Sequence, residues 1–441
     1  MKQIISSIRK KVIPTKQKDK EKSDIAKLAL ELVKKEVSKY SDVVSVELGG
    51  SFAKGTWLSD KADIDIFIKF KVSVSEKKFV EKSKRIGFAS MKKYHPYVRY
   101  SEHPYVEAKI KNTKVNVVPC YSVNLGNWKS SADRSPFHTH HMKNSLSDDM
   151  KNEVRILKAF LRAQGIYGAE IAKQGFSGYV AEVLILNFGN FENVAKTFAK
   201  IKENEVIGDT HNTFDTLISI IDPIDNNRNL AAAISNENIG KFILLCRSFI
   251  NKPTLSFFKR TITSSSKNWN NVLILKFSFS KRSPDIIWGQ VKKASSSIAT
   301  QLNIGGFKVI RFSAFTDEKK YAYLFFMLES FDISKVVLKE GPDFFNEHDT
   351  RQFIEKNKRK CDLMWVNNNG KVQCLVKRKT NNAKRFLTEL LKTANSGIPS
   401  GLQADFKKGY RVFVGDKNLS KSIKEEVSDL VSTNENIFYS T

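Results

Sequence analysis

A glycine-rich segment followed by two closely spaced aspartates constrains the fold of this chain more than any other feature of its sequence. The segment GGSFAKGT, residues 49–56, follows a strand predicted from alternating apolar residues over 44–48. Twelve residues after Ser51 comes Asp63, and Asp65 follows at the start of a second strand of period two. The two strands predict an α+β domain with a polar site where they meet.

The residue types in this pattern suit a site for phosphate and divalent cations. Glycines let the backbone approach a phosphate closely, while Ser51 and Lys54 would add a hydroxyl donor and a positive charge. Asp63 and Asp65 share one face of their strand, about 7 Å apart, and carboxylate oxygens suit hard divalent cations. The alternative is a glycine turn beside two exposed aspartates on an edge strand. The combination at this spacing favours the functional interpretation.

Changes of hydrophobic period divide the chain into three predicted domains. Residues 1–145 alternate helix and strand patterns after an amphipathic helix, and include a hairpin of strands 105–110 and 115–119. Residues 146–258 are mostly helical, with helices that start at Ser147 and Ser177. Residues 259–441 open with strand, helix, strand and strand, an order that resembles half of a ferredoxin-like or RNA-recognition-type unit.

The charge of the chain indicates a polyanionic partner. Lys and Arg number 74 against 46 Asp and Glu, a net charge of +28. Residues 351–411 hold 15 basic and 4 acidic side chains among aromatic ones, within a segment predicted to begin at Gly341. This basic region predicts a surface for RNA phosphates.

Composition excludes other classes of protein. A hydrophobic content of 41% excludes a disordered chain, and no apolar run approaches the roughly 18–20 residues of a membrane span. The start has no signal-peptide core, and the four cysteines are widely spaced without a C-x-x-C pair. These features predict a reduced, cytoplasmic protein.

The segment GGSFAKGTWLSDKADIDIFIKF resembles the signature of the polymerase-β nucleotidyltransferase superfamily. The whole chain resembles the archaeal-type (class I) CCA-adding tRNA nucleotidyltransferases, through further segments that include SEHPYVEAKI, KVNVVPCY, DRSPFHTHH, RILKAFLRAQGIYGAE, GFSGYVAEVLI and DPIDNNRNLAAAIS. The resemblance implies an α+β fold: a polymerase-β-like nucleotidyltransferase head (1–145), a helical neck (146–258), and a ferredoxin- or RRM-like body with a basic α+β tail (259–441).

The resemblance also implies a reaction, its cofactors and its partners. The enzyme would add C, C and A to tRNA 3′ ends from CTP and ATP, using two Mg²⁺ ions and holding the acceptor stem and T arm of the tRNA. A homodimer is possible, but the sequence does not determine the oligomeric state. Asp63 and Asp65 are implied as catalytic metal ligands, and the implied nucleotide-binding residues are Ser51, Lys54, His138, Lys158, Tyr167 and Arg228. Lys54 stands where the family usually has Arg, which keeps a charge but loses a two-pronged donor.

One position departs from the family pattern. The third catalytic carboxylate, also a metal ligand, falls on Asn116, whose amide oxygen can ligate a metal but cannot accept the proton of an attacking hydroxyl. Glu107, on the paired strand, is a candidate substitute if it faces the same way. Three explanations stay open: an engineered inactive variant, a natural homologue that binds tRNA or nucleotide without efficient transfer, and an enzyme that works with Asn. A related RNA nucleotidyltransferase with altered nucleotide choice is a further alternative.

Overall fold

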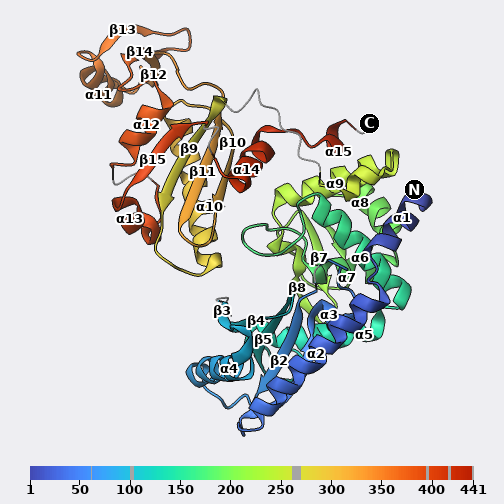
Figure 1. Ribbon diagram of the computed structural model, residues 1–441. Coiled ribbons are helices and arrows are strands. Elements are labelled where there is room, and N and C mark those ends of the chain that lie inside the picture. The colour runs from blue at the N-terminus through green and yellow to red at the C-terminus, as the bar shows by residue number, and fades with distance from the viewer. Residues whose placement is uncertain (61, 100–103, 261–269, 394–396, 416–418, 440–441) are drawn as a thin grey trace. The chain divides into compact units, whose positions relative to one another are not determined.

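The computed structural model describes residues 1–60, 62–99, 104–260, 270–393, 397–415 and 419–439, which form two compact units (Figure 1). The first unit comprises Met1–Thr261 and the segment from Thr433, and the second comprises most of residues 262–432. Helices and sheets occur in both, as the predicted α+β class requires. No helix in the described ranges is long and apolar enough to cross a membrane.

A five-stranded sheet in the order β1-β2-β5-β4-β3 forms the N-terminal part of the first unit. Strands β2 and β5 are parallel, and the other neighbours are antiparallel. The elements here are α1 (Lys2–Val12), α2 (Lys16–Val37), β1 (Val43–Gly49), α3 (Gly50–Lys54), β2 (Ile64–Phe70), α4 (Glu76–Ser90), η1 (Lys92–Tyr94), β3 (Tyr97–Arg99), β4 (Tyr105–Ile110) and β5 (Thr113–Tyr121).

Helices α2 and α4 cover one face of this sheet. Ile64, Ile66 and Ile68 of β2 pack against them in one hydrophobic core, so the alternate residues of β2 project from the opposite face. The strands predicted over 44–48, 64–70 and 105–119 are confirmed. The opposite face is the one that carries Asp65.

The rest of the first unit is mostly helical, as predicted, but it also contains a small sheet in the order β6-β7-β8. Ser147 and Ser177 cap helices α6 and α7 by accepting backbone N–H groups, as the sequence predicts. Helix α15, near the end of the described chain, packs through Ile437 into the hydrophobic core of this helical part. The elements are η2 (Ser131–Asp133), α5 (Arg134–Ser145), α6 (Asp148–Ala163), α7 (Gly178–Phe188), α8 (Phe191–Lys200), β6 (Glu205–Ile207), β7 (Ile218–Asp222), β8 (Asp225–Asn229), η3 (Leu230–Ala233), α9 (Asn236–Asn251), η4 (Leu255–Phe258) and α15 (Glu435–Phe438).

The second unit is built on a four-stranded antiparallel sheet in the order β10-β11-β9-β15. Its elements are β9 (Val272–Ser278), α10 (Pro284–Ile304), β10 (Val309–Thr316), β11 (Tyr321–Leu328), α12 (Ala383–Leu390), α13 (Ser400–Lys407), β15 (Tyr410–Val414) and α14 (Lys421–Val431). Helices α10, α12 and α13 pack on one face of the sheet, and α14 packs on the other.

A separate three-stranded sheet is inserted between β11 and β15. Its strands are β12 (Val336–Asp343), β13 (Cys361–Val366) and β14 (Lys371–Lys377), in the order β12-β14-β13. Helix α11 (Glu347–Asn357) connects β12 to β13. Gly341 lies inside β12, so the prediction that a segment begins there is wrong. The basic region 351–411 therefore runs through the inserted sheet and then through α12 and α13 to β15.

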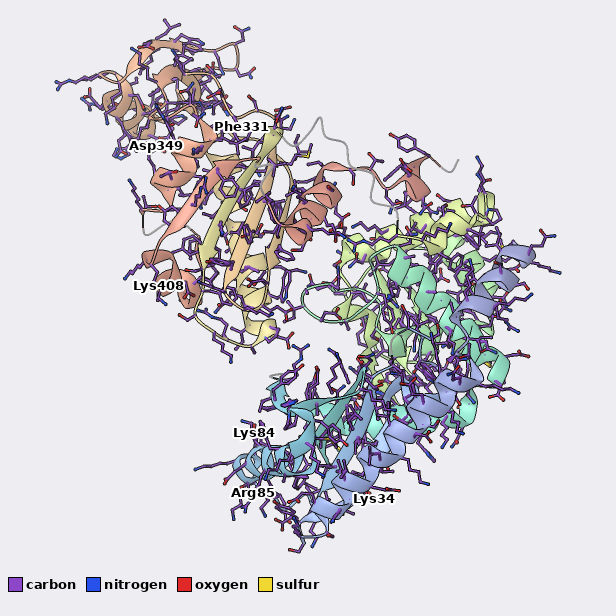
Figure 2. The ribbon with its side chains drawn as sticks, in the orientation of Figure 1. Lys34, Lys84, Arg85, Phe331, Asp349 and Lys408 are labelled. Carbon is purple, nitrogen blue, oxygen red and sulfur yellow. The ribbon has the colours of Figure 1, made fainter. Side chains whose placement is uncertain are left out.

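Positive charge is not confined to the basic region. Lys34 on α2 and Arg85 on α4 are exposed side chains of the first unit, whereas the exposed Lys408, after α13 in the second unit, belongs to the basic region (Figure 2). The net charge of +28 is therefore spread over both units.

Candidate active site

The glycine turn between β1 and α3 is shaped to fit the carboxylate of Asp65. Gly50 has φ +67°, a backbone conformation that L side chains rarely adopt, and a Cβ atom added there would overlap Asp65. A Cβ atom at Gly49 would overlap the ring of Phe67. The turn thus needs glycine for backbone conformation and for space. Ser51 lies on the single turn of α3 that follows.

The register of the sheet brings the sequence-predicted acidic site together. Asp65 pairs with Gly49 on β1 and with Asn116 on β5, so these residues form one row across three strands. Asn116 Nδ2 donates to Asp65 Oδ1 at 2.8 Å. Burial raises the pKa of Asp65; the hydrogen bond from Asn116 opposes this rise, and the nearby charge of Asp63 adds to it. Asp63, half-buried, directly precedes β2.

Asn116 Oδ1 is the atom that fits a cation at this row. It is buried and has no hydrogen-bond partner among the described residues, although a buried carbonyl oxygen is normally paired. Oxygen atoms from Asp63, Asp65 and Asn116 form the donor set that a hard divalent cation takes. These three residues could therefore hold a metal ion. The described part of the chain contains no cluster of three or more His, Cys, Asp or Glu side chains suited to one.

Glu107 faces the same way as Asn116, because the two residues pair directly between antiparallel β4 and β5. Its buried carboxylate already has three partners. Tyr97 donates its hydroxyl to Glu107, and Arg99 and Lys114 lie 3.4 and 3.3 Å away as ion-pair partners. Glu107 therefore lies on the face that a substitute acid requires, but its carboxylate is already bound by these three partners.

Two predicted nucleotide-binding lysines meet at a buried acid that the sequence analysis missed. Glu182 on α7 is fully buried and binds the ammonium groups of Lys54, at 2.5 Å, and Lys158, at 3.0 Å. Thr56 donates its hydroxyl to the same carboxylate. Burial alone would raise the pKa of Glu182, but the two lysine charges lower it to about 2.

Tyr167 completes this cluster beside Gly178. A Cβ atom at Gly178 would lie 3.0 Å from the Tyr167 hydroxyl and 3.4 Å from Lys158 Nζ, so glycine leaves room for both. Burial is the main reason that the pKa of Tyr167 is raised, which keeps the phenol neutral. Tyr167, Lys158 and Lys54 thus lie in one cluster.

A second buried acid, Asp222 at the end of β7, brings together two more of the predicted residues, His138 and Arg228. Its carboxylate is bound by His138 Nε2 at 2.9 Å, by the Tyr179 hydroxyl at 2.8 Å and by an Arg228 guanidinium nitrogen at 3.1 Å. The His138 and Tyr179 rings stack with centroids 3.8 Å apart. Burial lowers the pKa of His138, and the contact with Asp222 opposes this shift.

The two acid-centred clusters belong to one site. Tyr179 and Glu182 lie three residues apart on α7, and Lys54 Nζ lies 5.4 Å from the centre of the Tyr179 ring. The charge of Lys54 also acts on Asp65 and His138. His138 lies on helix α5, and Arg228 lies on β8. Tyr179, Glu182 and Asp222 were missed, although the segments GFSGYVAEVLI and DPIDNNRNLAAAIS contain them.

The fold and this arrangement define a nucleotidyltransferase. Residues 30–138 match the nucleotidyltransferase domain, residues 152–259 match the second domain of tRNA nucleotidyltransferases, and residues 270–415 match the C-terminal domain of CCA-adding enzymes. The CCA-adding enzyme of Sulfolobus acidocaldarius is 36% identical over 364 residues, which cover 81% of this chain and 86% of that protein.

Two further relatives agree. The CCA-adding enzyme of Saccharolobus shibatae is 35% identical over 374 residues, 84% of this chain and 88% of that protein. That of Sulfurisphaera tokodaii is 31% identical over 380 residues, 85% of this chain and 89% of that protein. This chain belongs to the CCA-adding enzyme family, as the sequence motifs predict.

The substitution Glu182→Gln tests the ion cluster. Because it leaves two buried lysines without a counter-charge, we expect the free energy of unfolding at pH 7 to fall by about 3–5 kcal/mol. The folded-state pKa of about 2 lies below the ordinary value of 4.5, so the stabilisation by Glu182 is present above pH 4.5 and is lost as pH falls towards 2. Denaturant unfolding across this pH range measures both effects.

Glu192→Gln is the matched control, because Glu192 forms an ion pair with Lys196 on the more accessible helix α8. We expect it to cost less than about 1 kcal/mol. Equal stabilities of the two variants would show that Glu182 does not hold the lysines in the way described.

Proposed function

We propose that this chain adds C, C and A to the 3′ ends of tRNA from CTP and ATP. The observation that carries the proposal is the row of Asp65 and Asn116 beside two clusters of cations, in a chain that belongs to the CCA-adding enzymes. The acidic row suits the metal side of nucleotidyl transfer, and the cations suit a triphosphate.

Asp63 and Asp65 are proposed as catalytic metal ligands, with Asn116 as the third, neutral ligand. Mg²⁺ is the proposed ion, since carboxylate and amide oxygens are the ligands it takes. The chemistry that two divalent ions supply in such sites is activation of the attacking hydroxyl and neutralisation of the charge on the triphosphate. Asn116 contributes an oxygen without a negative charge and cannot take the proton of the tRNA 3′-hydroxyl.

The nucleotide contacts follow from the two clusters. Lys54 and Lys158 together carry two positive charges against one at Glu182, so the cluster keeps a net charge of +1 towards a triphosphate. His138 and Arg228, held by Asp222, are proposed to contact the triphosphate and the base respectively. Ser51 is proposed to donate its hydroxyl to phosphate, and Tyr167 to line the pocket.

The basic region 351–411 is proposed to hold the acceptor stem and T arm through their phosphates. The division of the chain into a head, a neck, and a body with a tail is also proposed, on the basis of the family resemblance. A cytoplasmic location and a homodimer stay predictions.

Sequencing of reaction products tests the function directly. We expect tRNA ending at its discriminator base, incubated with ATP, CTP and Mg²⁺, to acquire CCA. Binding of tRNA without extension would instead indicate a catalytically impaired homologue, which the neutral Asn116 favours. Tails of other composition would indicate a related RNA nucleotidyltransferase with altered nucleotide choice.

Asn116→Asp restores the third carboxylate of the family pattern. We expect the rate of nucleotide addition to rise at least about 100-fold, because charge stabilisation at a metal site contributes several kcal/mol to the transition state. Single-turnover addition of CMP to tRNA measures the change. Equal rates for the two proteins would contradict the role given to position 116.

Glu107→Gln in both backgrounds shows whether Glu107 substitutes for the missing acid. Its carboxylate is bound by Tyr97, Arg99 and Lys114, so we expect similar, small losses with Asn or Asp at position 116. A large loss confined to the Asn116 background would assign the catalytic acid to Glu107.

Asp65→Asn separates catalysis from stability. Because burial raises the pKa of Asp65, its ionised form is less favourable in the folded than in the unfolded protein at pH 7. We expect addition to fall at least about 100-fold, while the unfolding temperature stays equal or rises. A variant that loses both activity and stability would indicate a structural role for this carboxylate.

A further inference from the structure

One face of the four-stranded sheet in the second unit, here called the outer face, is the face on which α14 packs. At one end it carries a row of aromatic and basic side chains. Phe315 pairs with Tyr323, Tyr323 with Lys276, and Lys276 with Arg411, across β10, β11, β9 and β15. Directly paired residues share a face, so all four side chains project from one side of the sheet. Tyr321, two positions before Tyr323, projects from the same side. We call these five residues the aromatic–basic strip.

Helix α14 covers the other end of this face. Ile274, Phe325 and Phe413, in the next row along the strands, are buried against Ile423 and Val427 of α14. In the strip, Phe315, Tyr321 and Lys276 are half-buried and Arg411 is exposed, whereas Tyr323 is buried and belongs to the core under α14. The outer face is therefore a hydrophobic core under α14 and an accessible surface beyond it.

The cations of the strip lie over aromatic rings. Lys276 Nζ is 4.4 Å from the centre of the Tyr321 ring and 5.4 Å from that of Tyr323. The guanidinium of Arg411 is 5.1 Å from the Phe413 ring, and Lys320 Nζ is 5.1 Å from the Tyr321 ring. Rings beneath the cations orient them without cancelling their charge.

Lys276 and Arg411 are like charges placed directly opposite each other, an arrangement that destabilises a sheet when nothing neutralises it. Both side chains contact rings, and neither forms an ion pair with a carboxylate in the described part of the chain. The nearby acids are used elsewhere. Asp317 accepts three backbone N–H groups of its own turn, and Glu318 accepts the Trp288 indole N–H.

We propose that the aromatic–basic strip binds the sugar–phosphate backbone of tRNA. Adjacent cations suit adjacent phosphates, and the half-buried rings of Phe315 and Tyr321 suit ribose or base faces. The inference rests on the proposed function, and it extends the RNA-binding surface from the basic region 351–411 to Lys276, Phe315 and Tyr321. Strand β11 thus has two roles: Phe325 packs under α14, and Tyr321 supports a cation.

The double variant Lys276→Gln/Arg411→Gln tests the proposal, and the double variant Lys293→Gln/Lys308→Gln is its control. The control pair removes the same charge from the second unit, from α10 and from the accessible ion pair with Glu329. We measure affinity for fluorescently labelled tRNA lacking CCA by anisotropy at several salt concentrations. We expect the strip variant to bind about tenfold more weakly, with a log–log salt slope smaller by about two, and the control to change less than about twofold.

Further measurements make the outcome specific. Lys276→Arg should restore most of the loss caused by Lys276→Gln, and no variant should unfold at a lower temperature than the natural chain. Equal losses in the strip and control pairs, or no loss in the strip pair, would overturn the proposal. So would an equal loss of binding to polyglutamate, a polyanion without ribose or bases.

The two levels of inference fail differently. If the natural chain neither binds tRNA nor extends it, the proposed function is wrong. If the natural chain does both and the strip variant binds as tightly, only the strip is wrong.

Discussion

The contact of one buried carboxylate, Glu182, with two ammonium groups is the interaction on which the nucleotide site depends. Burying Lys54 and Lys158 is costly unless a negative charge lies against them, and Glu182 on α7 supplies that charge. Glu182 therefore holds both lysines in position in the free protein. A site of this kind is preorganised, because its charges need not move far when a phosphate binds.

Helix α7 extends the same principle to the second cluster. Tyr179, one helical turn before Glu182, stacks on His138 and donates to Asp222, which also binds Arg228. One face of α7 thus sets the positions of groups from α3, α5, α6 and β8. The acidic row of Asp65 and Asn116 is fixed separately, by the parallel register of β2 and β5.

Local patterns predicted the elements that carry the site, and long-range contacts supplied what those patterns lacked. The alternation over 64–70 predicted β2 and the face of Asp65, because a period of two does not depend on the partner strands. Glu182 could not be inferred, because the partner of Lys54 lies 128 residues away in the chain. The facing of Glu107 and the return of β15 to β9 likewise depend on strand pairing. The roles of the site residues came from family resemblance and stay predictions.

The insertion of the β12–β14 sheet between β11 and β15 has a consequence for synthesis on the ribosome. Strand β9 is made early but receives β15 only after the inserted sheet has been translated. Until then β9 exposes an unpaired edge of N–H and C=O groups, which other chains can extend. The nascent protein therefore carries this additional open edge while the inserted sheet is being translated, until residues 410–414 pair with β9.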